Sequence, residues 1–205
     1  MSNINGDLRV IRTKESIRLA LVELINEKGF EAFTVKDITT RAKINRGTFY
    51  AHYQDKFDLM TKCEEEIMLE MSRITKQKFP SVIAALETDS HDLTPFSLTV
   101  SLFEYLSINS GFMKAVLGQK GDLSFQSKLK DFMWDTLYGN NPNSFIKEEN
   151  FLVPGQYLAS YMGTAIIGVI QQWLESGSKE SPQEMARILT TITVNGPYFA
   201  AGLKK

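Results

Sequence analysis

The stretch TVKDITTRAKINRGTFYAHYQDK, residues 34–56, decides the fold of this chain. Thr34 can cap a helix, with Asp37 three positions later as its capping-box partner. The apolar residues that follow fall at i, i+3 and i+7 and share one helix face: Val35, Ile38 and Ala42. Asn45 can cap a second helix, from Arg46 to about Tyr53. Two short helices joined by a tight turn predict a helix-turn-helix DNA-binding unit.

The start of the second helix carries the side chains best suited to reading DNA. Arg46 can form two hydrogen bonds with guanine, and Gly47 beside it permits the close approach of a backbone. The whole set of expected DNA contacts is Thr34, Lys36, Asn45, Arg46, Gly47, Thr48, Tyr50, His52 and Lys56. Among them we expect Arg46 and Thr48 to face base edges, and Tyr50, His52 and Lys56 to bind phosphates. Thr34 and Lys36 are expected to add DNA-backbone contacts aided by a helix N-terminus. Arg9 and Arg12 are expected to reach DNA from a flexible arm.

The same residues resemble those of the tetracycline-repressor-type (TetR) bacterial regulators. Members of this family carry a small-residue turn, a cap, the run Gly-Thr-aromatic-Tyr-x-His-aromatic and a Lys that opens the next helix. Here the run is GTFYAHY, residues 47–53, and the lysine is Lys56; IRLALVELINEKGFEAFTVKDI, residues 17–38, is similar to the first helix of the family and the entry to the second. The resemblance spans about residues 13–60. One departure is Lys43, which stands where the family often has glycine and must therefore fit the turn without glycine's freedom at positive φ.

The composition is that of a globular protein with one mildly basic end. The chain has 205 residues, of which 43% are hydrophobic and 23% charged, and its formal net charge is −1. Residues 1–62 hold 11 Lys and Arg against 8 Asp and Glu, whereas residues 63–205 hold 12 against 16. A protein that offers one end to phosphate fits this asymmetry. The single cysteine, Cys63, allows no internal disulfide, and neither a signal peptide nor a membrane span is expected, so we predict a cytoplasmic protein.

The rest of the chain predicts an all-α fold. Apolar spacing and capping signals give helices at residues 13–28, 56–78, 95–107, 123–137, 154–175 and 182–194, with a short one after Asn109. The expected domains are a three-helix DNA-binding domain over residues 1–55, a connecting helix over residues 56–80, and a ligand-binding and dimerisation domain over residues 81–205. The helix over residues 56–78 is expected to end near Pro80.

The second half resembles the ligand-binding and dimerisation domain of a TetR subgroup common in Firmicutes. The similar stretches are YLSINSGFMKAVLG, residues 105–118, and YLASYMGTAIIGVIQQWLESGSKESPQEMARIL, residues 157–189. The resemblance implies a homodimer formed by the last two helices, with contacts expected at Ala159, Gly163, Ile167 and Ile170. A cavity for an unknown, neutral or weakly polar effector is expected to be lined by Phe103, Phe112, Met113, Leu117, Phe132, Tyr157 and Tyr161.

The sequence offers little for catalysis. It has two histidines and one cysteine, no Cys/His cluster with metal spacing and no glycine-rich phosphate loop, so we expect no enzyme, cofactor or metal. The leading prediction is a dimeric repressor that a small molecule releases from a near-palindromic operator in double-stranded DNA. Two alternatives stay open: an activator or co-regulator whose body contacts another protein, and a helical enzyme.

Overall fold

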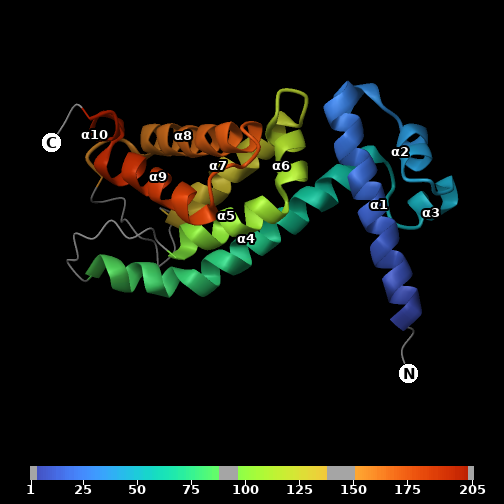
Figure 1. Cartoon of the computed structure of the whole chain (residues 1–205), viewed down its shortest axis with the longest axis horizontal. Coiled ribbons are helices and arrows are strands. Elements are labelled where there is room, and N and C mark those ends of the chain that lie inside the picture. The colour runs from blue at the N-terminus through green and yellow to red at the C-terminus, as the bar shows by residue number, and fades with distance from the viewer. Residues whose placement is uncertain (1–3, 88–96, 138–150, 203–205) are drawn as a thin grey trace. The chain divides into compact units, whose positions relative to one another are not determined.

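The computed structural model describes residues 4–87, 97–137 and 151–202, and within them the fold is all-α, as predicted. No strand occurs in these three ranges (Figure 1). The elements are α1 (Ile4–Lys28), the 3₁₀ turn η1 (Phe30–Ala32), α2 (Val35–Arg41), α3 (Arg46–Tyr50), α4 (Lys56–Glu87), α5 (Ser97–Ile108), α6 (Ser110–Leu117), α7 (Leu123–Leu137), α8 (Gly155–Glu175), α9 (Pro182–Asn195) and α10 (Pro197–Ala200).

The chain divides into two compact units, which we call the head and the body. The head comprises residues 1–67 together with 115–123, and the body comprises residues 68–114 and 124–205. Helix α4 is continuous through residue 67, so its first twelve residues belong to the head and the remainder to the body. The division also falls within α6, after residue 114, and within α7, after residue 123, so three helices span it.

The core of the head is built from the apolar faces of its helices. The side chains from α1 to α4 that are almost fully buried there are Ile17, Leu21, Leu24, Ile25, Ile38, Phe49, Leu59 and Met60. The predicted capping box is confirmed: the Asp37 amide donates to the Thr34 hydroxyl at 3.4 Å, and the Thr34 amide donates to the Asp37 carboxylate at 2.8 Å. Such a box satisfies two backbone donors that the first turn of α2 leaves open. This fixes where α2 begins.

The turn between α2 and α3 forces Lys43 into the left-handed region, at φ 54°. The Lys43 amide donates to the Thr40 carbonyl and the Ile44 amide donates to the Thr39 carbonyl, at 3.3 and 3.0 Å, so the turn is hydrogen-bonded on both sides. A non-glycine residue pays for this conformation with strain between its Cβ and the backbone. The expectation that Lys43 adopts the turn without glycine's freedom is confirmed.

We expect Lys43→Gly to stabilise the head by about 0.5–1 kcal/mol relative to Lys43→Ala. Both changes remove the same exposed cation, but only glycine relieves the strain at positive φ. Chemical denaturation followed by helical circular dichroism compares the two variants. Equal stabilities would show that the turn carries no strain.

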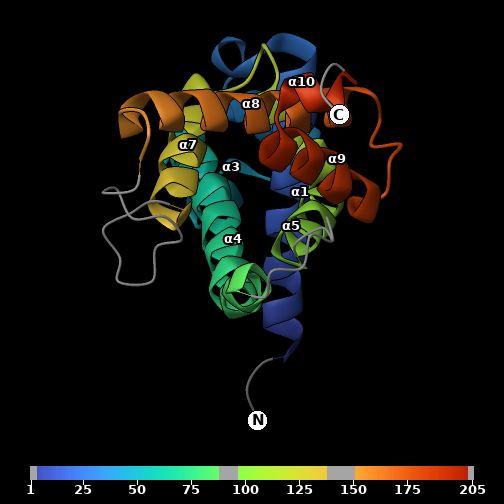
Figure 2. The ribbon, with the colours of Figure 1, turned by 90° about the vertical axis from the view of Figure 1, so that its left-hand side faces the viewer.

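The body packs its helices around a second apolar core. Helix α9 lies along α5 and α10 and touches α8 (Figure 2). The rings of Phe103 on α5 and Trp173 on α8 meet edge to face, with centroids 5.3 Å apart. The predicted cap of α9 is confirmed, because the Ser181 hydroxyl accepts from the Glu184 amide at 3.3 Å and the Ser181 amide donates to the Glu184 carboxylate at 2.8 Å.

Three helix boundaries differ from the prediction. Helix α1 begins at Ile4, so Arg9 and Arg12 are helical and do not belong to a flexible arm; the Thr13 hydroxyl donates to the Arg9 carbonyl at 2.8 Å, within the helix. Helix α3 ends at Tyr50, three residues early. Helix α4 continues through Pro80 to Glu87, because an interior proline removes one backbone donor but does not always end a long helix. The predicted start of α5 at Pro95 lies outside the described residues.

Candidate functional site

The first turn of α3 is organised by Asn45. Its side-chain oxygen accepts from the Thr48 amide at 2.7 Å and from the Thr48 hydroxyl at 3.0 Å. A Cβ added to Gly47 would lie 3.3 Å from the same oxygen, so glycine leaves room for the cap. Arg46 and Gly47 are exposed, whereas Thr48 is partly covered by its bond to Asn45. The helix therefore presents Arg46 outward from a rigid, capped turn.

Two aromatic residues hold α3 against the head. Phe49 is fully buried and Tyr53, just beyond the helix, is almost so; their ring centroids are 5.6 Å apart. Burial raises the pKa of the Tyr53 phenol to about 12. Tyr50 is exposed, although its ring meets that of Phe49 edge to face with centroids 5.6 Å apart, and His52 is partly buried. The exposed face of α3 thus carries Arg46, Gly47 and Tyr50.

Lys56, an expected phosphate contact, is turned into the head. Its side chain is 13% exposed, and its ammonium donates to the carbonyls of Phe30 and Glu31 at 2.9 and 3.2 Å. The same nitrogen lies 5.0–5.2 Å from three ring centroids, those of Phe30, Phe33 and Phe57. In this conformation Lys56 fastens η1 to the start of α4, and a phosphate would have to compete with two carbonyls and three rings for it.

We expect Lys56→Met to destabilise the head by about 2 kcal/mol, because it removes a charged hydrogen-bond donor from two carbonyls, one of them in a part-buried bond, and from three aromatic rings. Methionine keeps the apolar length of the side chain, so the loss of stability measures the contribution of the ammonium group. Thermal unfolding measures this loss, and Lys14→Met, at an exposed position on α1, is the matched control. Two variants that melt alike would mean that the inward contacts of Lys56 contribute nothing.

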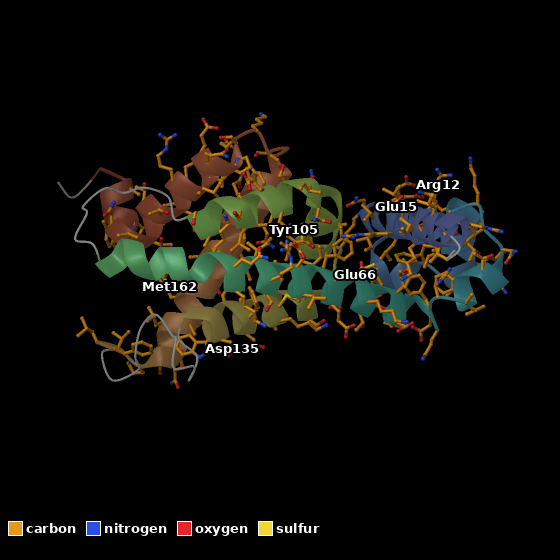
Figure 3. All side chains as sticks on the ribbon, turned by 90° about the horizontal axis from the view of Figure 1, so that it is seen from below. Arg12, Glu15, Glu66, Tyr105, Asp135 and Met162 are labelled. Carbon is orange, nitrogen blue, oxygen red and sulfur yellow. The ribbon has the colours of Figure 1, made fainter. Side chains whose placement is uncertain are left out.

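The remaining cations of the head fall into two groups. Several are paired with carboxylates, among them Arg41 with Glu23 and Glu27 at 2.9 and 2.6 Å, and Lys62 with Asp58 at 2.9 Å. Within the described part of the head, no carboxylate lies within ion-pair distance of Arg9, Arg12, Lys14, Lys36, Lys43 or Arg46. Arg12 and Glu15 lie about one turn apart on α1 (Figure 3), yet Arg12 is among these unpaired cations.

Three of these unpaired cations share a surface groove. A groove of about 450 Å³ runs between α1 and the turn before α3 and is lined by Arg9, Arg12 and Lys43 together with Leu8, Thr13, Ser16, Ala42 and Ile44. A cluster of cations without internal partners is available to a polyanion at little desolvation cost. The Thr34 hydroxyl, by contrast, is engaged by Asp37, and the hydrogen bond holds the pKa of that carboxyl below its usual range. Lys36, two residues after Thr34, is exposed.

The body contains a partly open, apolar cavity of about 160 Å³. Its lining residues come from α4 to α9: Met71, Thr75, Leu98, Thr99, Leu102, Phe103, Leu106, Met113, Leu129, Phe132, Met133, Ile166, Ile170 and Leu189. Three of the seven predicted ligand residues are among them, namely Phe103, Met113 and Phe132. The sequence analysis did not predict that α4 lines the cavity. The apolar residues Met71 and Ile74, three apart and next to Thr75, could have indicated that this face of α4 is turned to the core.

The other four predicted ligand residues lie elsewhere. Phe112 and Leu117 are buried but do not line the cavity, and Leu117 belongs to the head. Tyr157 and Tyr161 are 64% and 57% exposed on the outer face of α8. The prediction for these four is therefore wrong for this cavity, because an apolar residue on a helix can serve either of two faces.

Most of the residues predicted to form dimer contacts on α8 are buried within the body. Gly163, Ile167 and Ile170 are buried inside their own body, and a Cβ on Gly163 would lie 3.1 Å from the Lys130 side chain. These three cannot present a surface to a partner as the helix stands, and Ala159 is half-buried. The residues that α8 does expose at spacings of three and four are Tyr157, Tyr161, Thr164, Gly168 and Gln172.

That exposed stripe continues into a groove between α8 and α9. The groove measures about 460 Å³, and its lining includes Gly168, Val169, Gln172 and Ile188. A Cβ on Gly168 would meet nothing within 4 Å. A partner helix could therefore approach α8 closely at this position.

Other classes of site find no support in the described residues. No group of three His, Cys, Asp or Glu side chains there could hold a metal ion, and no described helix is both long and apolar enough to cross a membrane. Cys63 is buried, and burial raises the pKa of its thiol to about 12, which disfavours the reactive thiolate.

Two family models match the chain. The one described as bacterial regulatory proteins, tetR family, matches residues 17–63, and the one described as transcriptional regulator C-terminal region matches residues 94–195. The first covers most of the described head, including α2 and α3. The second covers α5 to α9.

Curated relatives match over shorter stretches. The HTH-type transcriptional repressor BepR of Brucella suis biovar 1 (strain 1330) is 30% identical over 109 residues, 46% of this chain and 52% of BepR. The HTH-type transcriptional regulator YxbF of Bacillus subtilis (strain 168) is 40% identical over 55 residues, 26% of this chain and 14% of YxbF. The chain thus spans about half the length, or less, of these relatives.

Solved structures match over almost the whole chain. A TetR transcriptional regulator from Streptococcus agalactiae 2603V has a TM-score of 0.56 at 20% identity, covering 92% of this chain and 97% of that one. NalD, the secondary repressor of the MexAB-OprM multidrug efflux pump in Pseudomonas aeruginosa, has a TM-score of 0.59 at 17% identity, covering 90% and 95%. At these identities the likeness shows a shared fold.

Proposed function

This chain belongs to the tetR family of bacterial regulatory proteins, and we propose that it is a cytoplasmic repressor that binds its operator as a homodimer. The observation that carries the proposal is the exposed, capped first turn of α3, with Arg46 directed outward and unpaired cations nearby. The family is one of transcription regulators, in line with the expectation that the protein is not an enzyme.

We propose that α3 lies in the major groove. Arg46 is the main reader of base edges, since its guanidinium has no carboxylate partner in the described head. Thr48 contributes through its methyl group and hydroxyl while Asn45 holds it in place. Lys36, Tyr50 and His52 contact phosphates, and the groove cations Arg9, Arg12 and Lys43 add backbone contacts from α1 and the turn.

We propose that two heads act together through a dimer of bodies. One α3 covers few base pairs, so two copies related by a two-fold axis and separated by about 34 Å are needed for useful specificity. The exposed stripe of α8 and its groove with α9 supply the interface, which replaces the buried residues expected from sequence. Such an interface is self-complementary, as two-fold symmetry requires.

We propose that a small-molecule effector in the body cavity controls DNA binding through α4. Met71 and Thr75 of α4 line the cavity, and the same helix begins at Lys56 in the head. An effector that prefers the DNA-incompetent arrangement by about 1.4 kcal/mol lowers operator affinity tenfold. The coupling requires no contact between effector and DNA.

Titration of the purified protein onto DNA from upstream of its own gene tests the proposal. Fluorescence anisotropy should show binding at least a hundredfold tighter than to shuffled DNA of the same length, with affinity falling steeply as salt rises. Equal affinity for both sequences would contradict specific operator recognition.

A further inference from the structure

Resting on the proposed role of the body cavity, we propose that its ligand is an uncharged, single-ring molecule with one hydrogen-bond donor, such as a simple phenol. Three observations carry this inference: the size of the cavity, the absence of charge among its described lining residues, and the placement of Thr75.

The size of the cavity limits the ligand to about one ring. Its volume is about 160 Å³. An apolar protein cavity of about 150 Å³ remains dry and binds benzene, so the two spaces are alike in scale. Larger polycyclic or long-chain molecules would require the body helices to move apart. The cavity as it stands selects a compact ligand.

The lining excludes ionised ligands. None of its described residues is charged, and the walls are formed by leucine, isoleucine, methionine and phenylalanine side chains, among them Met71, Met113, Phe103 and Phe132. A carboxylate or ammonium would lose its hydration on entry and find no opposite charge. The flexible methionines and the aromatic rings instead suit a polarisable, uncharged ring.

The polar side chains in the apolar lining are those of Thr75 and Thr99. The hydrogen bonding of Thr75 indicates which polar group the ligand should carry. The Thr75 hydroxyl donates to the Met71 carbonyl at 2.8 Å in a buried position, so its proton is already committed. Its oxygen retains a lone pair and can still accept. A ligand hydroxyl that donates to Thr75 would match this geometry, whereas a ligand that only accepts would depend on Thr99. A single donor on a small ring is therefore favoured.

Trp173 can show by its fluorescence whether a ligand occupies the cavity. The Trp173 ring packs edge to face on Phe103, which lines the cavity, and the Trp173 indole donates to the Glu180 carbonyl at 3.0 Å. A ligand against Phe103 should change the environment of Trp173. Because the sequence has two tryptophans, a Trp134→Phe background isolates this signal.

The test compares three molecules of similar shape: p-cresol, toluene and p-toluate. Binding is read without DNA, by Trp173 fluorescence in the Trp134→Phe protein and by thermal shift. We expect p-cresol to bind most tightly, toluene about tenfold more weakly, and p-toluate at least a hundredfold more weakly. Binding of p-toluate as tight as that of p-cresol would overturn the proposal, as would a lack of binding by both uncharged rings.

Two substitutions locate the binding. Thr75→Val should lower the affinity for p-cresol about tenfold and leave that for toluene unchanged. Leu102→Phe should fill part of the cavity and abolish the binding of p-cresol and of toluene. Ile108→Phe, at an exposed position on the same helix, should leave the binding of both molecules unchanged. Binding that survives Leu102→Phe in a folded protein would place the ligand elsewhere and overturn the inference.

Operator binding is measured separately, so the two proposals can fail independently. If the protein binds its operator but neither uncharged ring, the ligand class is wrong and the DNA-binding proposal stands. If p-cresol binds in the cavity and the operator is never released, the ligand class is supported and the coupling through α4 is wrong.

Discussion

Arg46→Ala is expected to weaken operator binding by about 1–3 kcal/mol, or roughly 5- to 150-fold, while binding to unrelated DNA changes much less. Arg46 is exposed at the first turn of α3, and within the described head it has no carboxylate partner. Its guanidinium can therefore form two hydrogen bonds with a guanine edge without first breaking an internal contact. The loss should be concentrated at the base pair that Arg46 reads.

Two control variants distinguish base-specific recognition by Arg46 from a general loss of positive charge. Lys36→Ala removes an exposed cation from the neighbouring helix and should weaken all sequences similarly, with a flatter salt dependence. Arg46→Lys keeps the charge but cannot form the paired hydrogen bonds, so it should recover little specificity. Anisotropy titrations on operators altered one base pair at a time give the result. An Arg46→Ala protein with unchanged operator affinity would remove Arg46 as the reading residue.

The features that sequence could predict are those determined within a few residues. The caps at Thr34, Asn45 and Ser181 are present, because each depends on a side chain meeting an amide three residues later. The constraint on Lys43 was expected because similar regulators often have glycine at that position of the turn. The exact span of α7, Leu123–Leu137, was predicted for the same reason: its apolar repeat is local.

What sequence could not predict depends on which face of a helix meets its neighbours. Helix α8 is apolar on more than one side, so Ile167 and Tyr161 both resembled contact residues, yet one is buried and the other exposed. Lys56 matched a DNA-contact pattern, but its ammonium donates hydrogen bonds to two carbonyls on η1, about 25 residues away in the sequence. Both outcomes are set by tertiary packing, which a periodic pattern in a single helix does not specify.

Gly168→Arg is expected to turn the dimer into a monomer and to reduce operator affinity by about 10²-fold or more, because two linked heads bind far more tightly than one. Gly168 belongs to the exposed stripe on α8 and lines the groove with α9. A Cβ there meets nothing within 4 Å, so a single subunit can accept the arginine without internal strain. In a close interface between two copies, however, it would bring two like charges and two long side chains together.

Gly111→Arg is the matched control for this substitution. Gly111 is also helical and exposed, and a Cβ there likewise meets nothing within 4 Å, but it lies on a different helix, α6, and does not line the groove between α8 and α9. Sedimentation at micromolar concentration should show a dimer for the wild type and for Gly111→Arg, and a folded monomer for Gly168→Arg. Operator affinity should follow the same order. If Gly168→Arg remained a dimer with full affinity, the interface would lie on another face of the body, and the exposed residues Tyr157 and Tyr161 would need a different explanation.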